Sequence, residues 1–395
     1  MSENIIYIAA AGSGKTSLIL EQVDEKLNKD FPEDKNIAII TYTIKNQENI
    51  KQRLIYKYGS VPRHVRLIGW YTFLLDYWIR PFKGDVLSEL YDRHIGLHFV
   101  ESASGIKYVN GRWYPTYKKN NLWGKFFCSN QKDIYSDKLG EFAISCFNKN
   151  KQDLIIRLTS IFDSIYIDEA QDLASWDFEI VKILAKTQTI NIILCADPRQ
   201  NTYSTNYSSL NKKYNGLPDL YAKEKINTKR KKYIDIDNET LNRSHRCVDE
   251  ICDFANNLMP YYTESHACNC EKCIKNRKDY PFPKGIYLLY QSKEKQYLDT
   301  YYPISLIWDV GSKAKVKTET CYNYAESKGL EADAVIIYPT KTIINYLKNG
   351  TKLSDMSARK LYVAVTRAKY TCAIVVPDNF DGRHCHLPFW NIEKK

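Results

Sequence analysis

The apolar positions of this chain fall into short continuous runs separated by stretches with helical spacing. Runs of this length that are rich in Ile, Val and Tyr are typical of buried strands, and they occur at Ile5–Ala9, Ile37–Tyr42, Val65–Ile68, Ile165–Asp168, Ile190–Cys195, Ala334–Tyr338 and Cys372–Val376. After the first run, apolar residues recur with the period of a helix over Thr16–Leu27. Strands that alternate with helices indicate an α/β fold built on parallel sheets.

The alternation is interrupted in the first half of the chain. Residues 81–157 are instead mixed in character, with many aromatic and basic side chains. Strand–helix alternation returns after about residue 158 and continues past a lysine-rich stretch. We therefore predict an N-terminal α/β domain formed by 1–80 and 158–235, an inserted subdomain over 81–157, and a second α/β domain over 236–395.

A glycine-rich segment, Ala11-Gly12-Ser13-Gly14-Lys15-Thr16, lies between the first strand and the first helix. Its glycines allow backbone N–H groups to surround phosphate oxygens, and the N-terminus of the helix adds positive potential. We expect Lys15 to reach the β- and γ-phosphates, the Thr16 hydroxyl to bind Mg²⁺, and Ser17 to lie beside them. Ala9 replaces the first glycine of the usual pattern, and the alternative is an ordinary Gly-Ser turn.

An acidic motif, Asp168-Glu169-Ala170-Gln171-Asp172, ends a later strand. Asp168 is placed to hold Mg²⁺, and Glu169 is placed to orient or deprotonate an attacking water. The alternative is a solvated acidic pair, which would not explain its position at a strand end in a chain with a phosphate loop. Together the two motifs predict an ATP hydrolase with ATP and Mg²⁺ as cofactors.

Composition adds a possible class of partner. The 395 residues are enough for two or three domains, and the formal charge is +11 with 31 Tyr and 7 Trp. Cations and flat rings suit nucleic acid, although AT-rich coding produces the same bias. We expect a cytoplasmic protein with no membrane partner, because no segment is apolar over a bilayer's width and no cleavable signal is visible. The 11 cysteines are then expected to be reduced or metal-bound.

Further motifs follow the strands in a fixed order. They are Thr41–Asn46, Gly69–Phe73, Ala196–Tyr203, Ser244–Cys247, Ser327–Asp333 and Leu361–Lys369. With the phosphate loop and the acidic motif, this series resembles the superfamily 1 helicases of the UvrD/Rep type over nearly the whole chain. The resemblance implies two RecA-like P-loop NTPase domains with parallel sheets, a mainly helical inserted subdomain, and ATP in the cleft between the two domains.

The resemblance also implies roles for residues on the ATP side. Gln200 would sense the γ-phosphate, and Arg246 and Arg367 would be arginine fingers that stabilise charge on the transferring phosphoryl group. Gly329 and Glu331 would contact the γ-phosphate and the ribose. A surface salt bridge is the alternative role for each arginine.

On the nucleic-acid side, the resemblance implies that Tyr42 and Tyr203 stack on bases and that Thr72 contacts phosphate. Stacking tolerates any base sequence, which a motor moving along a strand requires. The alternative for either tyrosine is packing in the core.

The chain departs from the family pattern in three respects. No glutamine-containing segment precedes the phosphate loop, so adenine recognition is left open, and His245 replaces a tyrosine that stacks on the base. Only about eighty residues separate Arg246 from Ser327, where larger relatives insert a regulatory accessory domain. Ala325 and Leu74 replace histidines, which predicts weaker coupling between DNA and ATP.

A cysteine-rich segment suggests a metal site. His266, Cys268, Cys270 and Cys273 place four zinc ligands within eight residues. Cys270-x-x-Cys273 has the spacing of a zinc knuckle, although four ligands this close strain a tetrahedron. His384-Cys385-His386 is an alternative source of ligands. Zn²⁺ is therefore a candidate cofactor, and uncommitted surface thiols are the alternative.

The leading hypothesis is an ATP-dependent translocase or helicase on single-stranded DNA, with 3′→5′ polarity implied by resemblance. RNA stays an open alternative, because backbone contacts carry little sequence information. The runner-up is a nucleotide- and DNA-sensing regulatory subunit of a partner nuclease, as in compact UvrD-like proteins of antiphage systems of the Gabija type. A small-molecule kinase or GTPase would leave Arg246, Glu331 and Arg367 without roles.

Overall fold

The structure is a computed structural model that describes residues 3–115, 119, 123–129, 132–202, 206–309, 311, 316, 320–382 and 384–391. Its contacts divide the chain into two compact units, each assembled from separate stretches of sequence. Unit 1 comprises Met1–Tyr7, Thr16–Pro198 and Ser204–Asp237, and unit 2 comprises Ile8–Lys15, Arg199–Tyr203 and Asn238–Lys395. Most of the phosphate loop therefore belongs to unit 2 by its contacts. The three-part division into domains that the sequence suggests stays a prediction.

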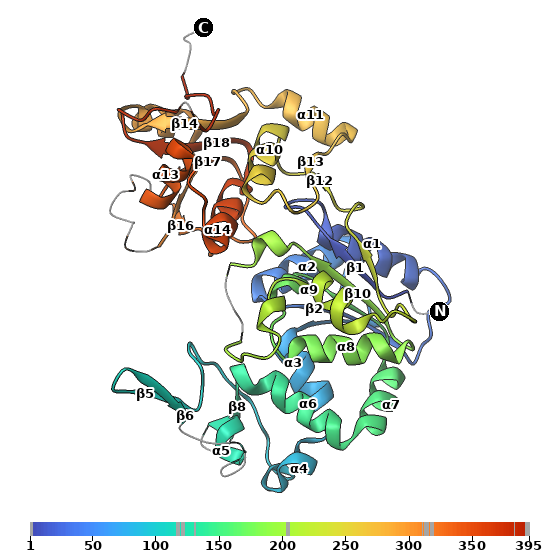
Figure 1. The fold of residues 1–395 in the computed structure, drawn as a ribbon. Coiled ribbons are helices and arrows are strands. Elements are labelled where there is room, and N and C mark those ends of the chain that lie inside the picture. The colour runs from blue at the N-terminus through green and yellow to red at the C-terminus, as the bar shows by residue number, and fades with distance from the viewer. Residues whose placement is uncertain are drawn as a thin grey trace. The chain divides into compact units, whose positions relative to one another are not determined.

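Unit 1 is built around a six-stranded sheet in the order β11-β1-β10-β9-β2-β3 (Figure 1). The strands are β1 (Ile5–Ile8), β2 (Asn36–Thr41), β3 (Val65–Gly69), β9 (Phe162–Ile167), β10 (Asn191–Ala196) and β11 (Asp235–Asp237). The pairs β1–β11, β10–β9, β9–β2 and β2–β3 are parallel. Because the carboxyl ends of parallel strands meet at one edge, the segments that follow β2, β3, β9 and β10 lie along the same edge.

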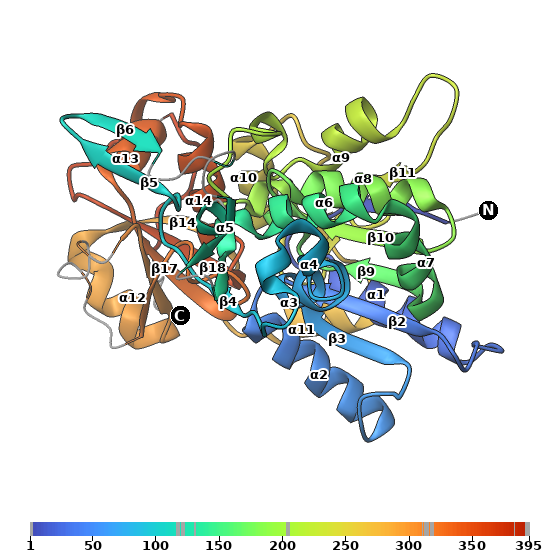
Figure 2. The same ribbon diagram turned by 90° about the horizontal axis from the view of Figure 1, so that it is seen from below.

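The helices of unit 1 follow the predicted alternation. They are α1 (Lys15–Leu27), α2 (Ile44–Tyr58), α3 (Trp70–Phe73), α4 (Lys83–Val86), α5 (Trp123–Phe127), α6 (Leu139–Lys149), α7 (Lys151–Ile161), α8 (Asp177–Thr187) and α9 (Pro218–Tyr221). Figure 2 shows α2 beside β3, which it contacts. A π-helix, Leu74–Ile79, continues from α3 and packs against α6. Leu74 is fully buried there, which accounts for an apolar side chain in place of a histidine.

The inserted stretch combines helices with a small amount of sheet. Its described residues hold β4 (Leu97–His98), β5 (Ile106–Val109), β6 (Arg112–Pro115), β7 (Cys128–Ser129) and β8 (Asp133–Tyr135). β5 and β6 form an antiparallel hairpin, and β4, β8 and β7 form a separate three-stranded sheet. The larger helices α6 and α7 follow these strands and return the chain to β9.

Unit 2 is built around a parallel five-stranded sheet in the order β14-β18-β17-β15-β16. Its strands are β14 (Gly285–Tyr290), β15 (Ile304–Ile307), β16 (Cys321–Asn323), β17 (Ala332–Tyr338) and β18 (Ala368–Val376). Its helices are α10 (Asp249–Leu258), α11 (Glu271–Asp279), α12 (Glu294–Tyr301), α13 (Lys341–Asn349) and α14 (Asp355–Val365). Two short strands, β12 (Arg243–Ser244) and β13 (His266–Ala267), pair in parallel apart from this sheet.

Both faces of the second sheet are covered by core. Side chains alternate along β17, so that Val335 and Ile337 pack with residues of α10, α13 and α14, while Ile336 packs with Tyr297 of α12 and with Trp390. This arrangement explains why β17 and β18 read as continuous apolar runs, since strands buried on both faces have no polar side. The predicted strands at these positions are confirmed, and the fold is α/β with parallel sheets as expected.

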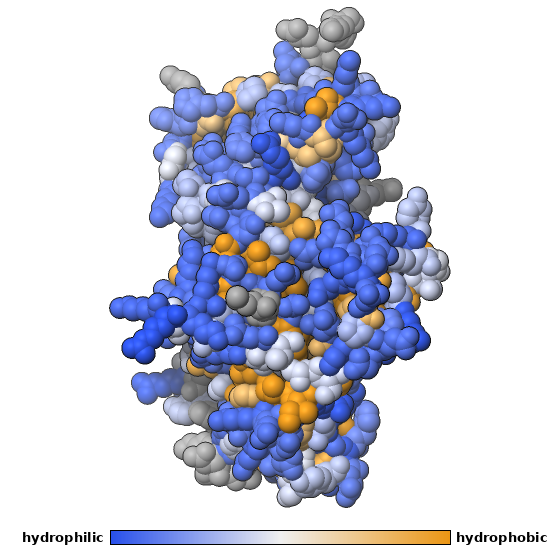
Figure 3. Space-filling view, turned by 90° about the vertical axis from the view of Figure 1, so that its right-hand side faces the viewer, coloured by the Kyte–Doolittle hydropathy of each residue, from blue (hydrophilic) through white to orange (hydrophobic). Residues whose placement is uncertain are grey.

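Among the described residues, no helix is long and apolar enough to cross a membrane. On the face drawn in Figure 3, hydrophilic side chains predominate, and the hydrophobic ones lie in separate groups.

Candidate functional site

The predicted Mg²⁺ ligands meet in unit 1. The Thr16 hydroxyl donates a hydrogen bond of 2.8 Å to Oδ2 of Asp168. Thr16 lies in the first turn of α1, and Asp168 directly follows β9, where its backbone N–H donates to the Ile40 carbonyl. Asp168 is only 1% exposed. A hydroxyl and a carboxylate held together at the start of a helix form the protein side of the magnesium site of P-loop NTPases.

Glu169 has an unusual backbone for its residue type. Its φ of 58° lies in the left-handed region, which costs free energy for a residue with a Cβ. Its N–H donates to Oδ1 of Asp168, and its carboxylate accepts a hydrogen bond from the Gln171 amide. Gln171 in turn accepts the Asp197 N–H at 2.9 Å, so the motif is joined to the end of β10. These contacts fix the position of the carboxylate that we expect to act on water.

The phosphate loop is held by unit 2. The Ala11 N–H donates to the Tyr362 hydroxyl at 3.1 Å, and the Ser244 hydroxyl donates to the Ala11 carbonyl at 2.8 Å. The His245 N–H donates to the Gly12 carbonyl at 2.9 Å. The loop therefore contacts the two segments that carry the predicted arginine fingers.

Gly12 is required at its position for two reasons. Its φ is +71°, and a Cβ built on it would lie 2.5 Å from the Arg246 Cβ. A side chain there would strain the backbone and displace the segment that carries Arg246.

The loop residues fit a phosphate ligand. The Ser13 hydroxyl is buried and has no hydrogen-bond partner, which is the condition of a donor that awaits an oxygen from a ligand. Lys15 is 8% exposed and begins α1. The Ser17 hydroxyl accepts a hydrogen bond of 2.8 Å from Arg53 of α2.

Arg246 is paired with Glu331, the residue predicted to contact ribose. Its Nε lies 3.1 Å from a Glu331 carboxylate oxygen, and its Nη1 donates to the Thr366 carbonyl. Burial alone would raise the pKa of Glu331, but the charges and hydrogen bonds of Arg246 and Lys369 outweigh it and lower that pKa. Gly329, nearby in sequence, has a φ of +80° that suits glycine.

Arg367 is 1% exposed and contacts Gln200. Its Nη2 lies 3.3 Å from the Gln200 side-chain oxygen, and its other N–H groups bond the carbonyls of Val363 and Leu330. The structure therefore brings together the predicted γ-phosphate sensor and the second predicted arginine finger. A surface salt bridge is ruled out for Arg367 by its burial.

Two residues near the loop were not assigned roles from the sequence. Arg199 is buried, donates to the Ala9 carbonyl at 2.9 Å, and lies with its guanidinium 5.1 Å from the centre of the Tyr362 ring. Tyr362 accepts the Ala11 N–H described above. Both lie inside motifs that the sequence singled out, but no spacing rule indicates that either one reaches the phosphate loop.

The predicted nucleic-acid residues are placed in three different ways. The half-buried Tyr42 donates from its hydroxyl to Asp177 at 2.9 Å, and its ring stacks on Trp70 at 6.0 Å between centres. Thr72 is exposed, as a phosphate contact requires. Tyr203 lies outside the described residues. Asp177 also accepts hydrogen bonds from the Trp70 indole and the Ala174 N–H, and burial raises its pKa to about 6.

The cysteine segment forms a cluster, with one ligand different from the prediction. Cys268, Cys270 and Cys273 lie with His245 so that one potential ligand atom from each is within 4.8 Å of the others. We expected His266 as the fourth ligand. His266 instead lies in β13, opposite Arg243 of β12, and is exposed. In the part of the chain that the structure describes, the alternative set 384–386 does not join the cluster either.

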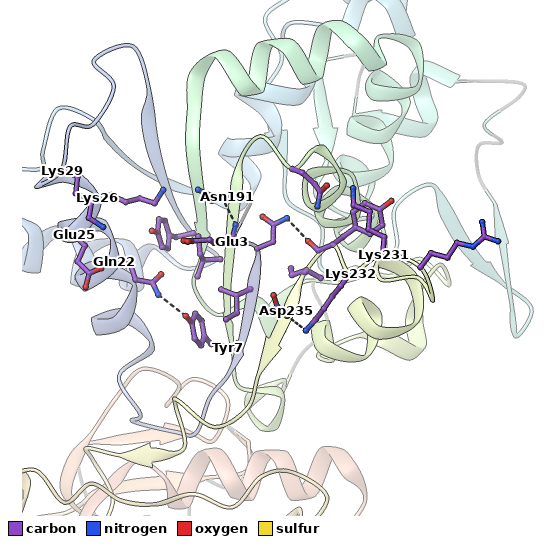
Figure 4. Close-up of a pocket in the computed structure, with 18 residues that line it drawn as sticks. Glu3, Tyr7, Gln22, Glu25, Lys26, Lys29, Asn191, Lys231, Lys232 and Asp235 are labelled. Carbon is purple, nitrogen blue, oxygen red and sulfur yellow. Dashed lines mark hydrogen bonds and ion pairs between the residues drawn. The ribbon is translucent and has the colours of Figure 1, made fainter. Parts of the chain in front are cut away.

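Two cavities differ in their relation to these residues. A cavity of about 180 Å³ in unit 2 is lined by Arg246, Glu331 and Tyr370, with His245 and Cys273. A larger one in unit 1, of about 1380 Å³, lies between α1 and the segment 230–235 (Figure 4).

None of the predicted site residues that the structure describes lines the larger cavity. Its cations are partly neutralised, because Lys26 pairs with Asp163 at 2.6 Å and Lys232 pairs with Asp235. The larger cavity is thus separate from the predicted ATP chemistry.

The glycine-rich loop, the contact between Thr16 and Asp168 and the contact between Gln200 and buried Arg367 are the features that we expect of a P-loop NTPase. The sequence model of the UvrD/REP helicase N-terminal domain matches residues 1–80 and 117–215. Over these residues, which are just under half of the chain, the sequence is similar to the N-terminal domain of UvrD/REP helicases.

Two characterised relatives share part of the sequence. The chain is 27% identical over 203 residues to the Gabija protein GajB of Bacillus cereus (strain VD045), covering 51% of this chain and 38% of that protein. It is 24% identical over 257 residues to the putative ATP-dependent DNA helicase YjcD of Bacillus subtilis (strain 168), covering 55% and 34%. The chain thus spans little more than a third of the length of either relative.

A solved structure of arterivirus nonstructural protein 10, a helicase in complex with DNA, covers 95% of this chain and 61% of its own. Its TM-score is 0.38 at 12% identity, which is too low to carry an argument.

Proposed function

We propose that this chain hydrolyses ATP to move along, or unwind, single-stranded DNA, with 3′→5′ polarity. The observation that carries the proposal is the hydrogen bond of 2.8 Å between Thr16 and Asp168, which presents two Mg²⁺ ligands at the start of the helix after a phosphate loop. The match to the UvrD/REP helicase N-terminal domain supports the choice of a nucleic-acid motor among P-loop NTPases.

Each ATP-side residue has a physical role in this proposal. The loop N–H groups and Lys15 bind phosphate oxygens, and Thr16 and Asp168 would hold Mg²⁺, which would supply positive charge to the phosphates. Glu169 orients the attacking water. Arg246 and Arg367 stabilise the charge that develops on the γ-phosphate, which arginine fingers do by about 10³–10⁵-fold in rate.

Gln200 is the residue that we expect to sense hydrolysis. Because its side-chain oxygen accepts from Arg367, a change at the γ-phosphate that moves the guanidinium also changes the contact of Gln200. Gln200 ends the short 3₁₀ turn Pro198–Gln200 that comes after β10, and β10 pairs with β9, the strand that Asp168 follows.

The contact with DNA is proposed for the segments that follow β2 and β3. Exposed Thr72 is available to a phosphate, and the Tyr42 ring, fixed by Trp70 and Asp177, presents a rigid surface for stacking. RNA offers the same phosphates and bases, so the nucleic acid has to be identified by experiment.

Steady-state ATP hydrolysis with and without single-stranded DNA, at low salt, tests the proposal. We expect DNA to stimulate turnover many-fold and Lys15→Ala to abolish it, while the matched variant Lys29→Ala, at an exposed position near the end of α1, keeps wild-type turnover. Arg367→Lys retains the charge but not the forked contacts, and we expect it to lose most of the activity. Full turnover in Lys15→Ala would refute the assignment of the phosphate loop.

A second function is favoured by one specific observation, the similarity to the Gabija protein GajB. In this alternative the chain binds nucleotide and DNA and regulates a partner nuclease in antiphage defence, with little unwinding of its own. Strand-displacement assays on the isolated chain separate the two proposals. Vigorous 3′→5′ displacement favours the motor, whereas DNA-independent turnover together with a stoichiometric nuclease partner favours the regulatory subunit.

A further inference from the structure

We propose that His245, Cys268, Cys270 and Cys273 bind one structural Zn²⁺, which fastens α11 to the segment that carries Arg246. The four ligand atoms come from three segments of the chain. His245 follows β12, Cys268 follows β13, and Cys270 and Cys273 lie at the start of α11. Three thiolates and one imidazole form one of the common ligand sets of closed, tetrahedral zinc sites.

The pairing of two short strands explains why His245 is a ligand and His266 is not. β12 and β13 run in parallel, with Arg243 opposite His266 and Ser244 opposite Ala267. The residues that follow the two strands, His245 and Cys268, are therefore neighbours, and the Cys268 N–H donates to the Ser244 carbonyl at 2.8 Å. The ladder thus brings His245 to a cysteine segment more than twenty residues further along the chain.

The start of α11 supplies the other two thiols. Cys270 is the residue before the first turn of the helix, and Cys273 lies within that turn. The Cys270 N–H donates to the Cys268 sulfur at 3.4 Å, a contact that stabilises a thiolate ligand. The Arg277 guanidinium donates to the Cys268 carbonyl at 2.6 Å and ties the cysteine segment to the helix.

The separation of His245 and Cys273 agrees with a single tetrahedral ion. Zn–S bonds of about 2.3 Å and Zn–N bonds of about 2.0–2.1 Å place a sulfur and a nitrogen ligand roughly 3.6 Å apart at the tetrahedral angle. Nδ1 of His245 and Sγ of Cys273 are 3.6 Å apart. No disulfide joins these cysteines, all of which are free thiols.

Burial of the ligands suits a structural rather than a catalytic ion. Cys268 and Cys273 are 6% and 8% exposed, whereas His245 and Cys270 are exposed. Two exposed ligands provide a path for the metal to enter, and two buried ligands anchor it. On binding, the three thiols release their protons to solvent, since thiolate is the ligand form.

A metal in this place acts on the predicted ATP site, a consequence that rests on the proposed function. His245 precedes Arg246, and its N–H holds the Gly12 carbonyl of the phosphate loop. Cys273 and Arg277 of α11 line the 180 Å³ cavity together with Arg246 and Glu331. Zinc would therefore fix one wall of that cavity and the direction of Arg246, and His245, once it is a ligand, is not free to stack on a base.

Metal analysis of the full chain, purified without chelators or a metal-affinity tag, tests the proposal. We expect close to one equivalent of zinc in the wild type and in the controls His266→Asn and Cys385→Ser, and nearly none in Cys270→Ser and His245→Asn. X-ray absorption on the wild type is expected to show zinc with three sulfur ligands and one nitrogen ligand. Any zinc that stays bound to His245→Asn is expected to lack the nitrogen ligand.

The outcomes separate this inference from the proposed function. Wild-type zinc content in His245→Asn, or iron with sulfide in place of zinc, would overturn the assignment whatever the ATPase activity. His245→Asn changes an exposed side chain, and circular dichroism checks that it folds even where Cys270→Ser does not. Loss of zinc with unchanged ATP turnover would keep the metal site and refute only its action on Arg246.

Discussion

At the scale of single residues, Asp177 is an example of a buried, hydrogen-bonded carboxylate in unit 1. It is buried at the start of α8 and accepts hydrogen bonds from Tyr42, Trp70 and Ala174. These bonds favour the charged form, but burial outweighs them and raises the pKa to about 6. A group whose pKa is higher in the folded than in the unfolded chain binds more protons when folded, so its contribution to stability is largest at low pH.

We therefore predict that Asp177 weakens the fold as pH rises from about 4 to about 6. Its contribution to the free energy of unfolding is expected to fall by about 1.4 kcal/mol for each pH unit in that window. Asp177→Asn cannot titrate at this position. The free energy of unfolding of the variant therefore rises relative to that of the wild type by this amount for each pH unit over the same range. Urea unfolding from pH 4 to 7 measures the difference, and parallel profiles for the two proteins would contradict the prediction.

The sequence could predict the residues that act through local patterns. Thr16 and Asp168 lie in motifs whose spacing is set by a loop, a strand and a helix, and the structure joins them. Asp177, Arg199 and Tyr362 could not be found in this way, because their partners are distant in sequence. The proximity of His245 to the cysteine cluster could not be predicted for the same reason, since it is set by the pairing of β12 with β13.

At the scale of elements, α2 shows how local signals set the two ends of a helix. The Thr43 hydroxyl accepts the Asn46 N–H at the N-terminus. At the C-terminus Gly59 adopts a φ of +78°, and its N–H bonds the Ile55 carbonyl. Glycine is favoured at such a position because a Cβ destabilises the left-handed conformation.

Gly59 allows this backbone effect to be measured alone. A Cβ at Gly59 would meet no atom within 4 Å, so any cost of a substitution there comes from the backbone conformation. We predict that Gly59→Ala lowers the free energy of unfolding by about 1 kcal/mol and that Gly59→Asn, which tolerates this conformation better, lowers it by less. Thermal unfolding compares the variants, and equal melting temperatures for all three proteins would contradict the prediction.

The elements that the sequence predicted are those with long, uniform patterns. The predicted strands β1, β2, β3, β9, β10, β17 and β18 are found in the two large sheets, whereas β11, β14, β15 and β16 of the same sheets were not predicted. The two-residue strands β12 and β13 and the short strands of the inserted stretch are not predictable, because so few residues show no period. Their formation depends on tertiary contacts rather than on propensity.

At the scale of the whole molecule, the net charge of +11 gives the chain a general attraction for polyanions. A protein that neutralises phosphates releases counterions, so its affinity for single strands falls with salt by a slope of about −0.7 per phosphate. For only three such phosphates, this slope gives a roughly 20-fold loss of affinity from about 50 to about 200 mM salt.

We predict a salt dependence of at least this size for a labelled oligonucleotide in fluorescence anisotropy. An uncharged peptide nucleic acid of the same base sequence serves as the control, and we expect it to bind much more weakly at low salt. Affinity that is independent of salt would show that the charge of the chain does not serve nucleic-acid binding.

The division of the chain into two units could not be predicted from the sequence order. Residues 8–15 and 199–203 are surrounded in sequence by unit 1 but make their contacts in unit 2. The cause is the packing of the phosphate loop against Ser244 and Tyr362 and of Arg367 against Gln200. The proposal of three domains with boundaries at 80, 158 and 236 describes the strand–helix rhythm but not these contacts.

The hydrogen bond between Ala11 and Tyr362 has a consequence during synthesis of the protein on the ribosome. The two residues are separated by 351 positions, and a ribosome adds about 5–20 residues per second. The phosphate loop is therefore synthesised roughly 20–70 s before its partner tyrosine is added. During that interval the phosphate loop of the nascent chain lacks this contact, and nucleotide can be bound in the way we propose only after Tyr362 has been added.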